Sequence, residues 1–448
     1  MPAPAERILD NGLRVIAFQQ RSAPKALGVP LIAAQLIVRG GGSAESDAEA
    51  GLSALTASLL TQGTTKRSAL EVAQSVDALG ARLDASSGFD AAVVSINATT
   101  PEFPQAFAIF DEVIRHPAFT PAEVERVRTK SISDLGLTYS NPSALARLVA
   151  NRVAYAAAPY GHPLAGTAET LASLTCAEAT HFHERWYRPD NAVLIVGGDI
   201  TPDDAFALAQ RVFGNWKKPS TPAAVLQPFS APPSRAHVVI VDKPDAGRTA
   251  IVAGRVAIAR NSPEYYAGTV ATAVLAGYSG RLNQEIRVKR GLSYGAGAQL
   301  ATRREPGLFI ASTLVDHTKV AEATKVVLDT IAGLGQTPVE AKELTTRKAT
   351  ITGAFYRGIE TIDGIAAAVG ELALYDMPLG ELERYVAGIQ AVRATDVEHF
   401  AKAHVASDAF VVLVGDAGVF GEAIRTAYPA VQIVPFAQLD LNRANLMR

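Results

Sequence analysis

The chain has 448 residues, of which 48% are hydrophobic and 19% are charged, a balance typical of a folded globular protein. Its formal charge is −2, from 42 Lys and Arg against 44 Asp and Glu, so nothing draws it electrostatically to nucleic acid or to an anionic membrane. The longest apolar stretches, 191–198 and 409–415, are strand-sized, whereas a membrane helix needs roughly 20 apolar residues. We therefore expect neither a nucleic-acid partner nor a membrane span.

The N-terminal residues 1–15 contain no basic stretch followed by an apolar run, so they predict no signal peptide in this form. The Met before Pro-Ala-Pro-Ala fits an initiator residue added to the sequence of a mature protein whose signal peptide has been removed. This interpretation predicts a periplasmic protein, with the cytoplasm as the alternative.

In the first half, short apolar runs alternate with helical periodicity. The predicted strands are 13–19, 31–38, 91–98 and 192–197, and the predicted helices are about 50–62, 68–82, 103–115, 121–138, 143–157, 175–186 and 202–213. Five prolines between 217 and 235 forbid regular structure and predict an extended linker.

In the second half, the predicted strands are 237–242, 250–257, 308–315 and 410–415, and the predicted helices are about 263–277, 281–290, 318–333, 338–357, 360–374, 380–390 and 394–403. Neighbouring strands follow one another directly and helices come in runs. This order favours an α+β fold with largely antiparallel sheets over a doubly wound one.

The two halves repeat each other. The stretch 181–197 matches 399–415, and 120–130 matches 337–347, at offsets of 218 and 217 residues. In the second pair each copy begins Thr-Pro with a Glu three residues after the Thr, which predicts the same helix start twice. We therefore predict two homologous units, each a largely antiparallel sheet packed with helices, at 1–216 and 236–448, joined by the linker 217–235.

Three motifs in order, NGLRV at 11–15, RGGGSAES at 39–46 and GLSALTASLLTQGT at 51–64, resemble the pitrilysin/insulinase family of zinc metallopeptidases, which includes the mitochondrial processing peptidases. The resemblance continues through 66–87, 159–171 and 185–199 and covers essentially the whole chain. It implies that the protein is built from homologous α+β units.

The resemblance also implies a zinc site that this chain has lost. Active members carry His-x-x-Glu-His on one helix, in which the two His grip the metal and the Glu activates the bound water. The matching positions here are Ala54, Ala57 and Ser58. A further Glu ligand is expected about 75–80 residues downstream, as the resemblance implies, but no Glu lies between Glu125 and Glu169. We expect no metal in this chain.

The other candidates for chemistry are weaker. His181 and His183, beside Glu184, point about 200° apart on a helix and so cannot share a metal. His162 lies in a Gly-His-Pro turn and is interpreted as structural. The single cysteine, Cys176, excludes an intrachain disulfide and is interpreted as a small buried hydrophobic residue.

The segment 280–300 resembles the family segment that carries an Arg and a Tyr seven residues apart, which Arg287 and Tyr294 match. In the family this pair hydrogen-bonds the peptide near the scissile bond. Both side chains are donors and neither hydrolyses a peptide alone. We expect both to face one cleft, with Arg281, Lys289 and Arg290 on a basic, solvated face.

These observations predict a non-catalytic subunit of a heterodimeric zinc metalloendopeptidase. A homologous partner would hold the zinc, and the two chains would close like a clamshell around an oligopeptide. A structural homologue without peptidase activity, similar to the core subunits of respiratory complexes, is the alternative. A third hypothesis is a stand-alone peptidase that uses Cys176 at a helix start, where the helix dipole lowers a thiol pKa.

Overall fold

The structure, a computed structural model, describes residues 4–20, 29–232, 237–428 and 430–448, and it divides into two compact units. The first unit contains Met1–Ile132, Leu164–Gln227 and Phe355–Arg384. The second contains Ser133–Pro163, Pro228–Ala354 and Tyr385–Arg448. Each unit thus takes most of its residues from one half of the chain and one segment from the other half.

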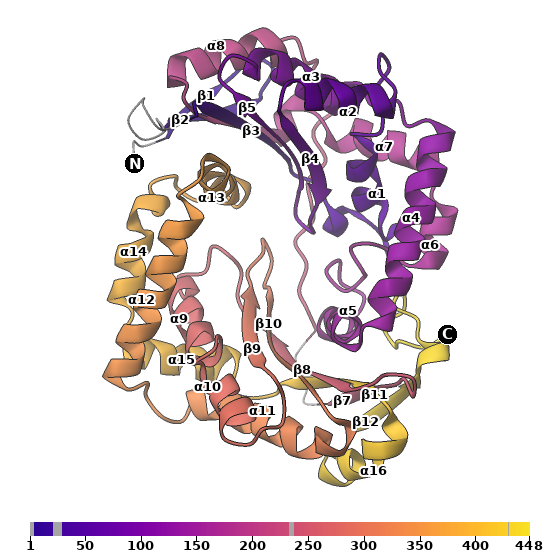
Figure 1. The fold of residues 1–448 in the computed structure, drawn as a ribbon, viewed down its shortest axis with the longest axis vertical. Helices are drawn as coiled ribbons and strands as arrows, with labels where there is room; N and C mark the ends of the chain where they lie inside the picture. The colour runs from indigo at the N-terminus through magenta and orange to yellow at the C-terminus, as the bar shows by residue number, and fades with distance from the viewer. Residues whose placement is uncertain (1–3, 21–28, 233–236, 429) are drawn as a thin grey trace. The chain divides into compact units, whose positions relative to one another are not determined.

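The first unit is built on a six-stranded sheet of order β1-β2-β6-β3-β5-β4 (Figure 1). Its strands are β1 (Ala5–Ile8), β2 (Arg14–Gln19), β3 (Leu31–Val38), β4 (Arg82–Ser87), β5 (Ala92–Thr99) and β6 (Ala192–Gly198). Only β2 and β6 pair in parallel among these strands. Every residue of β6 is buried, as its unbroken apolar run predicts.

Helices cover both faces of this sheet. On one face, α3 (Phe103–Arg115) packs on β5 and α8 (Pro202–Phe213) on β2, with the α3 rings stacked against one another and edge-on to Phe213. On the other face lies α13 (Ile362–Leu374), which packs on β3 and β6. Its Ile365, Val369 and Leu372 join Phe18 and Ile37 in one apolar cluster. A helix from the second half of the chain therefore completes the core of the first unit.

Five further helices begin in the first unit: α1 (Leu52–Leu59), α2 (Ala69–Ala78), α4 (Pro121–Ser140), α6 (Ala168–Ser173) and α7 (Cys176–Trp186). The helix α1 packs against α7 and against strands β4 and β5.

The second unit repeats this architecture with a sheet of order β12-β7-β11-β8-β10-β9 (Figure 1). Its strands are β7 (Val238–Asp242), β8 (Thr249–Val256), β9 (Ala296–Ala301), β10 (Leu308–Val315), β11 (Phe410–Gly415) and β12 (Val431–Pro435). Five neighbouring strands, from β7 to β9, match β2 to β4 of the first sheet in order and in direction. The predicted duplication and the α+β fold of two largely antiparallel sheets are confirmed.

One face of the second sheet carries α5 (Pro142–Tyr155), which packs on β8 and β11. The other face packs on α9 (Tyr265–Leu275), α11 (Val320–Leu334), α15 (Ala394–His404) and α16 (Ala417–Ala427). The remaining helices are α10 (Arg281–Asn283), α12 (Ala341–Gly358) and α14 (Glu381–Ala391). Here a helix from the first half of the chain covers the sheet of the second unit.

Several predicted boundaries differ from the observed ones. The helix expected at 68–82 ends at Ala78, because Gly80 takes a left-handed conformation (φ +56°) and the following residues form β4. The helix expected at 338 begins at Ala341, so the cap predicted for Thr337 and Glu340 does not form. The strands β1, β4, β9 and β12 and the helices α6 and α16 were not predicted.

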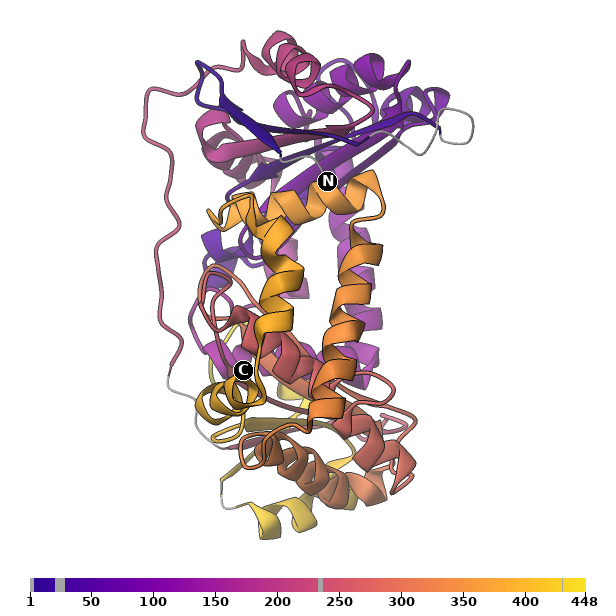
Figure 2. The same ribbon diagram turned by 90° about the vertical axis from the view of Figure 1, so that its left-hand side faces the viewer.

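Residues 217–232 contain neither helix nor strand and run as an extended segment (Figure 2). Among the described residues, no helix has the length and hydropathy needed to cross a bilayer.

Candidate functional site

The helix α1 occupies the place at which the family resemblance expects zinc ligands. It begins directly after Gly51, which takes a left-handed conformation (φ +97°). Ala57 is fully buried, and the Ser58 hydroxyl donates to the Ala54 carbonyl (2.9 Å). Two methyl groups and a hydroxyl that is already hydrogen bonded offer no ligand set for zinc. Across the described part of the chain, no three His, Cys, Asp or Glu side chains are arranged to hold a metal ion.

Glu45 fixes the beginning of this helix. The backbone N–H groups of Gly51 and Ser53 donate to its two carboxyl oxygens, and the residue is only 7% exposed. Burial raises the pKa of Glu45 to about 8, although these hydrogen bonds act in the opposite direction. The carboxyl group is therefore mostly protonated at pH 7, and it secures the first turn of α1.

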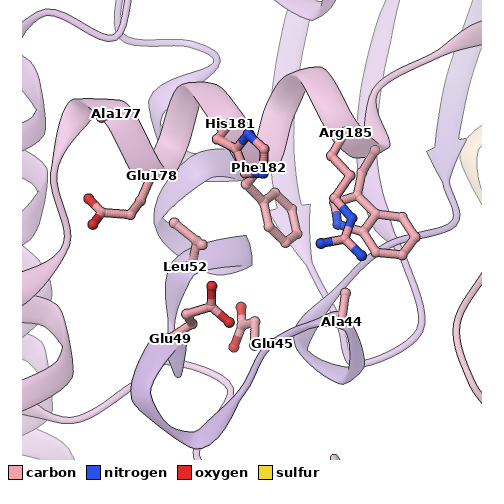
Figure 3. A pocket seen from close by; sticks show the side chains of 10 residues that line it. Ala44, Glu45, Glu49, Leu52, Ala177, Glu178, His181, Phe182 and Arg185 are labelled. Atoms are coloured by element: carbon pink, nitrogen blue, oxygen red, sulfur yellow. The ribbon is translucent and has the colours of Figure 1, made fainter. Parts of the chain in front are cut away.

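A cavity of about 280 Å³ lies between α7 and residues 44–52, which lead into α1 (Figure 3). Leu52, Phe182 and Trp186 give it apolar walls, and His181 and Arg185 project into it from successive turns of α7. Its carboxylates are engaged, because Glu49 and Glu178 each accept hydrogen bonds from the residue that caps their own helical turn. These two carboxylates are therefore occupied in capping.

His181 and His183 lie in different surroundings. His181 lines the cavity, whereas Nε2 of His183 donates to the Ile114 carbonyl (2.7 Å) and its ring stacks on Tyr187, with 4.7 Å between centroids. Burial lowers the pKa of His183 to about 4. This histidine is a neutral, half-buried residue whose Nε2 is occupied by a backbone carbonyl.

We expect the protonation of His183 to destabilise the protein in acid. Its pKa is about 6.5 in the unfolded chain and about 4 in the folded one. Neutral His183 therefore makes its full contribution to the free energy of unfolding above pH 6.5. Up to ~3 kcal/mol of this contribution is lost as the pH falls from 6.5 to about 4. Urea unfolding at pH 7 and pH 5 should show a smaller pH dependence for His183→Gln than for the wild type. The matched variant His181→Gln, at an exposed position, should keep the wild-type dependence, and equal curves for all three proteins would contradict the assignment.

The segment that carries the predicted Arg and Tyr is not the single helix expected at 281–290. The α-helical turn α10 continues as one π-helical turn, Gln284–Val288, and the chain then reverses at Gly291 (φ +61°). Short π-helical turns are frequent at functional sites. Arg287 lies in this turn, and Tyr294 lies in the loop before β9.

Arg287 and Tyr294 each lie against a residue that the sequence analysis missed. The Arg287 guanidinium carbon is 5.0 Å from the centre of the Tyr278 ring, and that of Arg248 is 5.1 Å from the centre of the Tyr294 ring. Tyr278 is 74% exposed and Tyr294 is 79% exposed. The result is two cation–π pairs on the surface of the second unit.

A buried amide ties these two pairs together. Asn283 is 3% exposed; its Nδ2 donates to the Tyr278 carbonyl (2.6 Å) and its Oδ1 accepts from the Ala296 N–H (3.4 Å). The Ser293 hydroxyl donates to the Leu314 carbonyl (2.7 Å). The loop is therefore anchored on both sides of Tyr294. No sequence pattern signals Tyr278 or Arg248, because only folding brings them to these positions.

The basic face predicted around Arg287 needs one correction. Arg281 is half-buried and paired, because it forms a two-pronged ion pair with Glu343 of α12 (3.2 and 2.8 Å) and its side chain is only 26% exposed. Lys289 and Arg290 are exposed and share Glu285. Arg281 thus belongs to the packing of the second unit.

The remaining candidates have structural surroundings. His162 is 1% exposed and contacts the carbonyl of Pro163. Cys176 is the half-buried first residue of α7, and within the described residues no histidine forms a hydrogen bond with its thiol.

Two sequence profiles of one peptidase family match this chain. The profile described as "Insulinase (Peptidase family M16)" matches residues 28–168, and the one described as "Peptidase M16 inactive domain" matches residues 173–351. The chain belongs to the M16 family. Its first unit carries Ala54, Ala57 and Ser58 where that family's zinc motif is expected.

Several M16 relatives carry the name "uncharacterized zinc protease". The one from Rickettsia felis is 24% identical over 70% of this chain and 73% of its own length. The one from Mycobacterium tuberculosis is 24% identical over 89% of this chain and 90% of its own. Among solved structures, a peptidase M16 inactive domain from Pseudomonas fluorescens superposes with a TM-score of 0.85 at 24% identity, covering 92% of this chain and 98% of that one. A protease from Helicobacter pylori gives a TM-score of 0.83 at 18% identity, covering 93% and 100%.

Proposed function

We propose that this M16 protein is the non-catalytic subunit of a heterodimeric zinc metalloendopeptidase that hydrolyses oligopeptides. A homologous partner would bind the zinc, and this chain would present Arg287 and Tyr294 to the peptide. The observation that carries the proposal is that all three functional groups of the zinc motif are replaced, while the Arg and Tyr keep the family spacing.

The state of the two side chains supports this role. Within the described part of the chain, neither the Arg287 guanidinium nor the Tyr294 hydroxyl donates a hydrogen bond to another residue. Their donors are therefore available for a ligand. Hydrogen bonds anchor the loop backbone on both sides of Tyr294, which lowers the conformational entropy that binding would cost.

The chemistry of peptide hydrolysis explains why donors are needed. Negative charge develops on the carbonyl oxygen as the tetrahedral intermediate forms, and fixed donors aimed at this oxygen lower the barrier. Arg287 and Tyr294 would bind the peptide and stabilise this charge. The metal and the attacking water would belong to the partner.

We further propose that the two chains close like a clamshell around the peptide, in the periplasm. An enclosed chamber admits unfolded oligopeptides, rejects folded proteins and excludes bulk water.

The proposal predicts that this chain alone does not cleave peptides and that it activates a zinc-bearing M16 partner. The experiment is to mix the purified chain with such a partner, chosen from the neighbouring reading frame, and to follow a quenched fluorescent peptide. Cleavage should need both chains and should saturate at a 1:1 ratio. The same partner activity with and without this chain would contradict the proposal and favour the structural homologue.

A further inference from the structure

A second cavity lies in the second unit, on the face of the sheet that α5 covers. Its volume is about 330 Å³, close to the lower end of the range of about 300–1,000 Å³ usual for small-ligand pockets. The floor consists of residues 250–252 of β8, residues 295–297 at the beginning of β9 and residues 312–314 near the end of β10. Ser143 and Arg147, one turn apart on α5, form the wall.

Among the described residues, the only charged side chain that lines this cavity is a cation. No Asp or Glu is among the residues that line it, and the polar side chains on this face of the sheet are Arg147 and the hydroxyls of Ser143 and Ser312. Thr313 follows Ser312 on β10, so its side chain points to the opposite, buried face. The Thr313 hydroxyl donates to the Gly295 carbonyl (2.9 Å). Arg147 is exposed, and within the described residues its guanidinium donates no hydrogen bond and forms no ion pair.

Arg152, on the same helix, has a structural role and differs from Arg147 in its surroundings. Arg152 is fully buried, and it donates to the carbonyls of Leu441 and Ala156 (2.8 Å each). Arg147, by contrast, lines the cavity with an exposed side chain that has no hydrogen-bond or ion-pair partner among the described residues. A site with an uncompensated guanidinium and hydroxyl groups is complementary to a carboxylate.

The cavity adjoins Tyr294. Its wall at Gly295 follows Tyr294 directly in the chain, and Arg248, whose cation lies against the Tyr294 ring, precedes the cavity residue Ala250 by two positions. The acidic group near Arg248 is Asp316. Hydrogen bonds from Thr318, and then the charges of His317 and Arg248, hold the pKa of Asp316 low. That carboxylate is occupied in capping its own turn (2.9 Å to the Thr318 N–H).

We infer that this cavity binds a carboxylate of the peptide substrate, from an Asp or Glu side chain or from the C-terminus, with Arg147 as its cation. The inference rests on the proposed function for the statement that a peptide meets Tyr294, and it adds a preference for acidic peptides. Arg147 would select the substrate, while Tyr294 and Arg287 contact the peptide group.

Direct binding to this chain alone tests the inference. The probe is a fluorescein-labelled decapeptide of Gly, Ser and Ala, prepared in three forms. One has two internal Glu residues and an amidated C-terminus, one has no Glu and a free C-terminus, and one has neither carboxylate. Fluorescence anisotropy should detect saturable binding of the first or the second form, identifying the source of the carboxylate, and should detect none of the third.

Two variants report on the cavity. Arg147→Ala should weaken binding roughly tenfold, because it removes a charge-assisted hydrogen bond. Gly297→Val should weaken it at least as much by filling the space. A Cβ on Gly297 would meet no atom within 4 Å, so the variant should fold, and Gly297 pairs with the cavity residue Ser312 across the strands. The matched control is Arg425→Ala, at an exposed arginine of α16.

Thermal melting confirms that each variant is folded. Loss of binding in both cavity variants but not in Arg425→Ala supports the inference. Unchanged affinity in both cavity variants, equal binding of the peptide without a carboxylate, or no saturable binding of any peptide overturns it. These measurements need no partner, so a failure to activate a zinc-bearing subunit would contradict the proposed function and leave this result unaffected.

Discussion

Replacing Arg287 by Ala, or Tyr294 by Phe, should lower kcat of the assembled peptidase by about 10²–10³ while the complex stays intact. Each change removes a donor aimed at the oxygen on which negative charge develops. The two losses should not add, because both donors serve the same charge. The measurement is kcat and KM on one peptide for the wild type, each single variant and the double variant, with assembly followed by gel filtration.

The control for this experiment follows from the ion pairs. Lys289→Ala should be mild, since Lys289 is exposed and Glu285 keeps Arg290 as a partner. Arg281→Ala is unsuitable as a control because it breaks the ion pair with Glu343. Lys at position 287 should restore little activity, since an ammonium group lacks the planar, two-donor geometry of a guanidinium. Near-wild-type kcat for Arg287→Ala in an intact complex would exclude the proposed role.

The sequence predicts the centre of each sheet better than its edges. β6 and β11 are buried at every position, and an unbroken apolar run predicts such strands. The edge strands β1 and β4 have exposed residues at most or at alternate positions and polar sequences, AERI and RLDASS, so periodicity offers little signal. The loss of the zinc motif could likewise be predicted, because it depends on residue identity and spacing alone.

Contacts between distant segments could not be predicted. Nothing in the sequence marks Tyr278, Arg248 or Arg147 as part of a site. Arg248 and Arg147 become its neighbours through the packing of α5, β8 and the loop before β9, and Tyr278, in the turn before α10, lies against Arg287. For the same reason an amphipathic pattern predicts that 360–374 is a helix but not which sheet it covers. The exchange of α5 and α13 between the halves of the chain therefore cannot be predicted from residue patterns along the sequence.

This exchange predicts that neither half of the chain folds alone. Residues 1–227 lack α13, whose Ile365, Val369 and Leu372 are at most 4% exposed in the folded unit. Burying three such side chains contributes about 5–9 kcal/mol, which is comparable to the whole stability of a typical domain. Residues 228–448 lack α5, which covers β8 and β11. Each half expressed alone should aggregate or lack a cooperative thermal transition.

Two control proteins distinguish the loss of the exchanged helix from a general effect of cutting the chain. Cleaving the folded protein at a protease site inserted between 217 and 227 leaves every helix in place, since this segment has no helix or strand, and the nicked protein should melt near the intact one. A first half with residues 355–384 appended through a Gly-Ser linker should regain a cooperative transition, because it again contains all segments of the first unit. If residues 1–227 alone melted cooperatively at the temperature of the intact chain, α13 would not be part of the first core. We expect instead that neither half folds alone. In that case the homologous repeats and the folding units divide the chain differently: the repeats meet near 217–235, whereas each folding unit takes one helix from the other half.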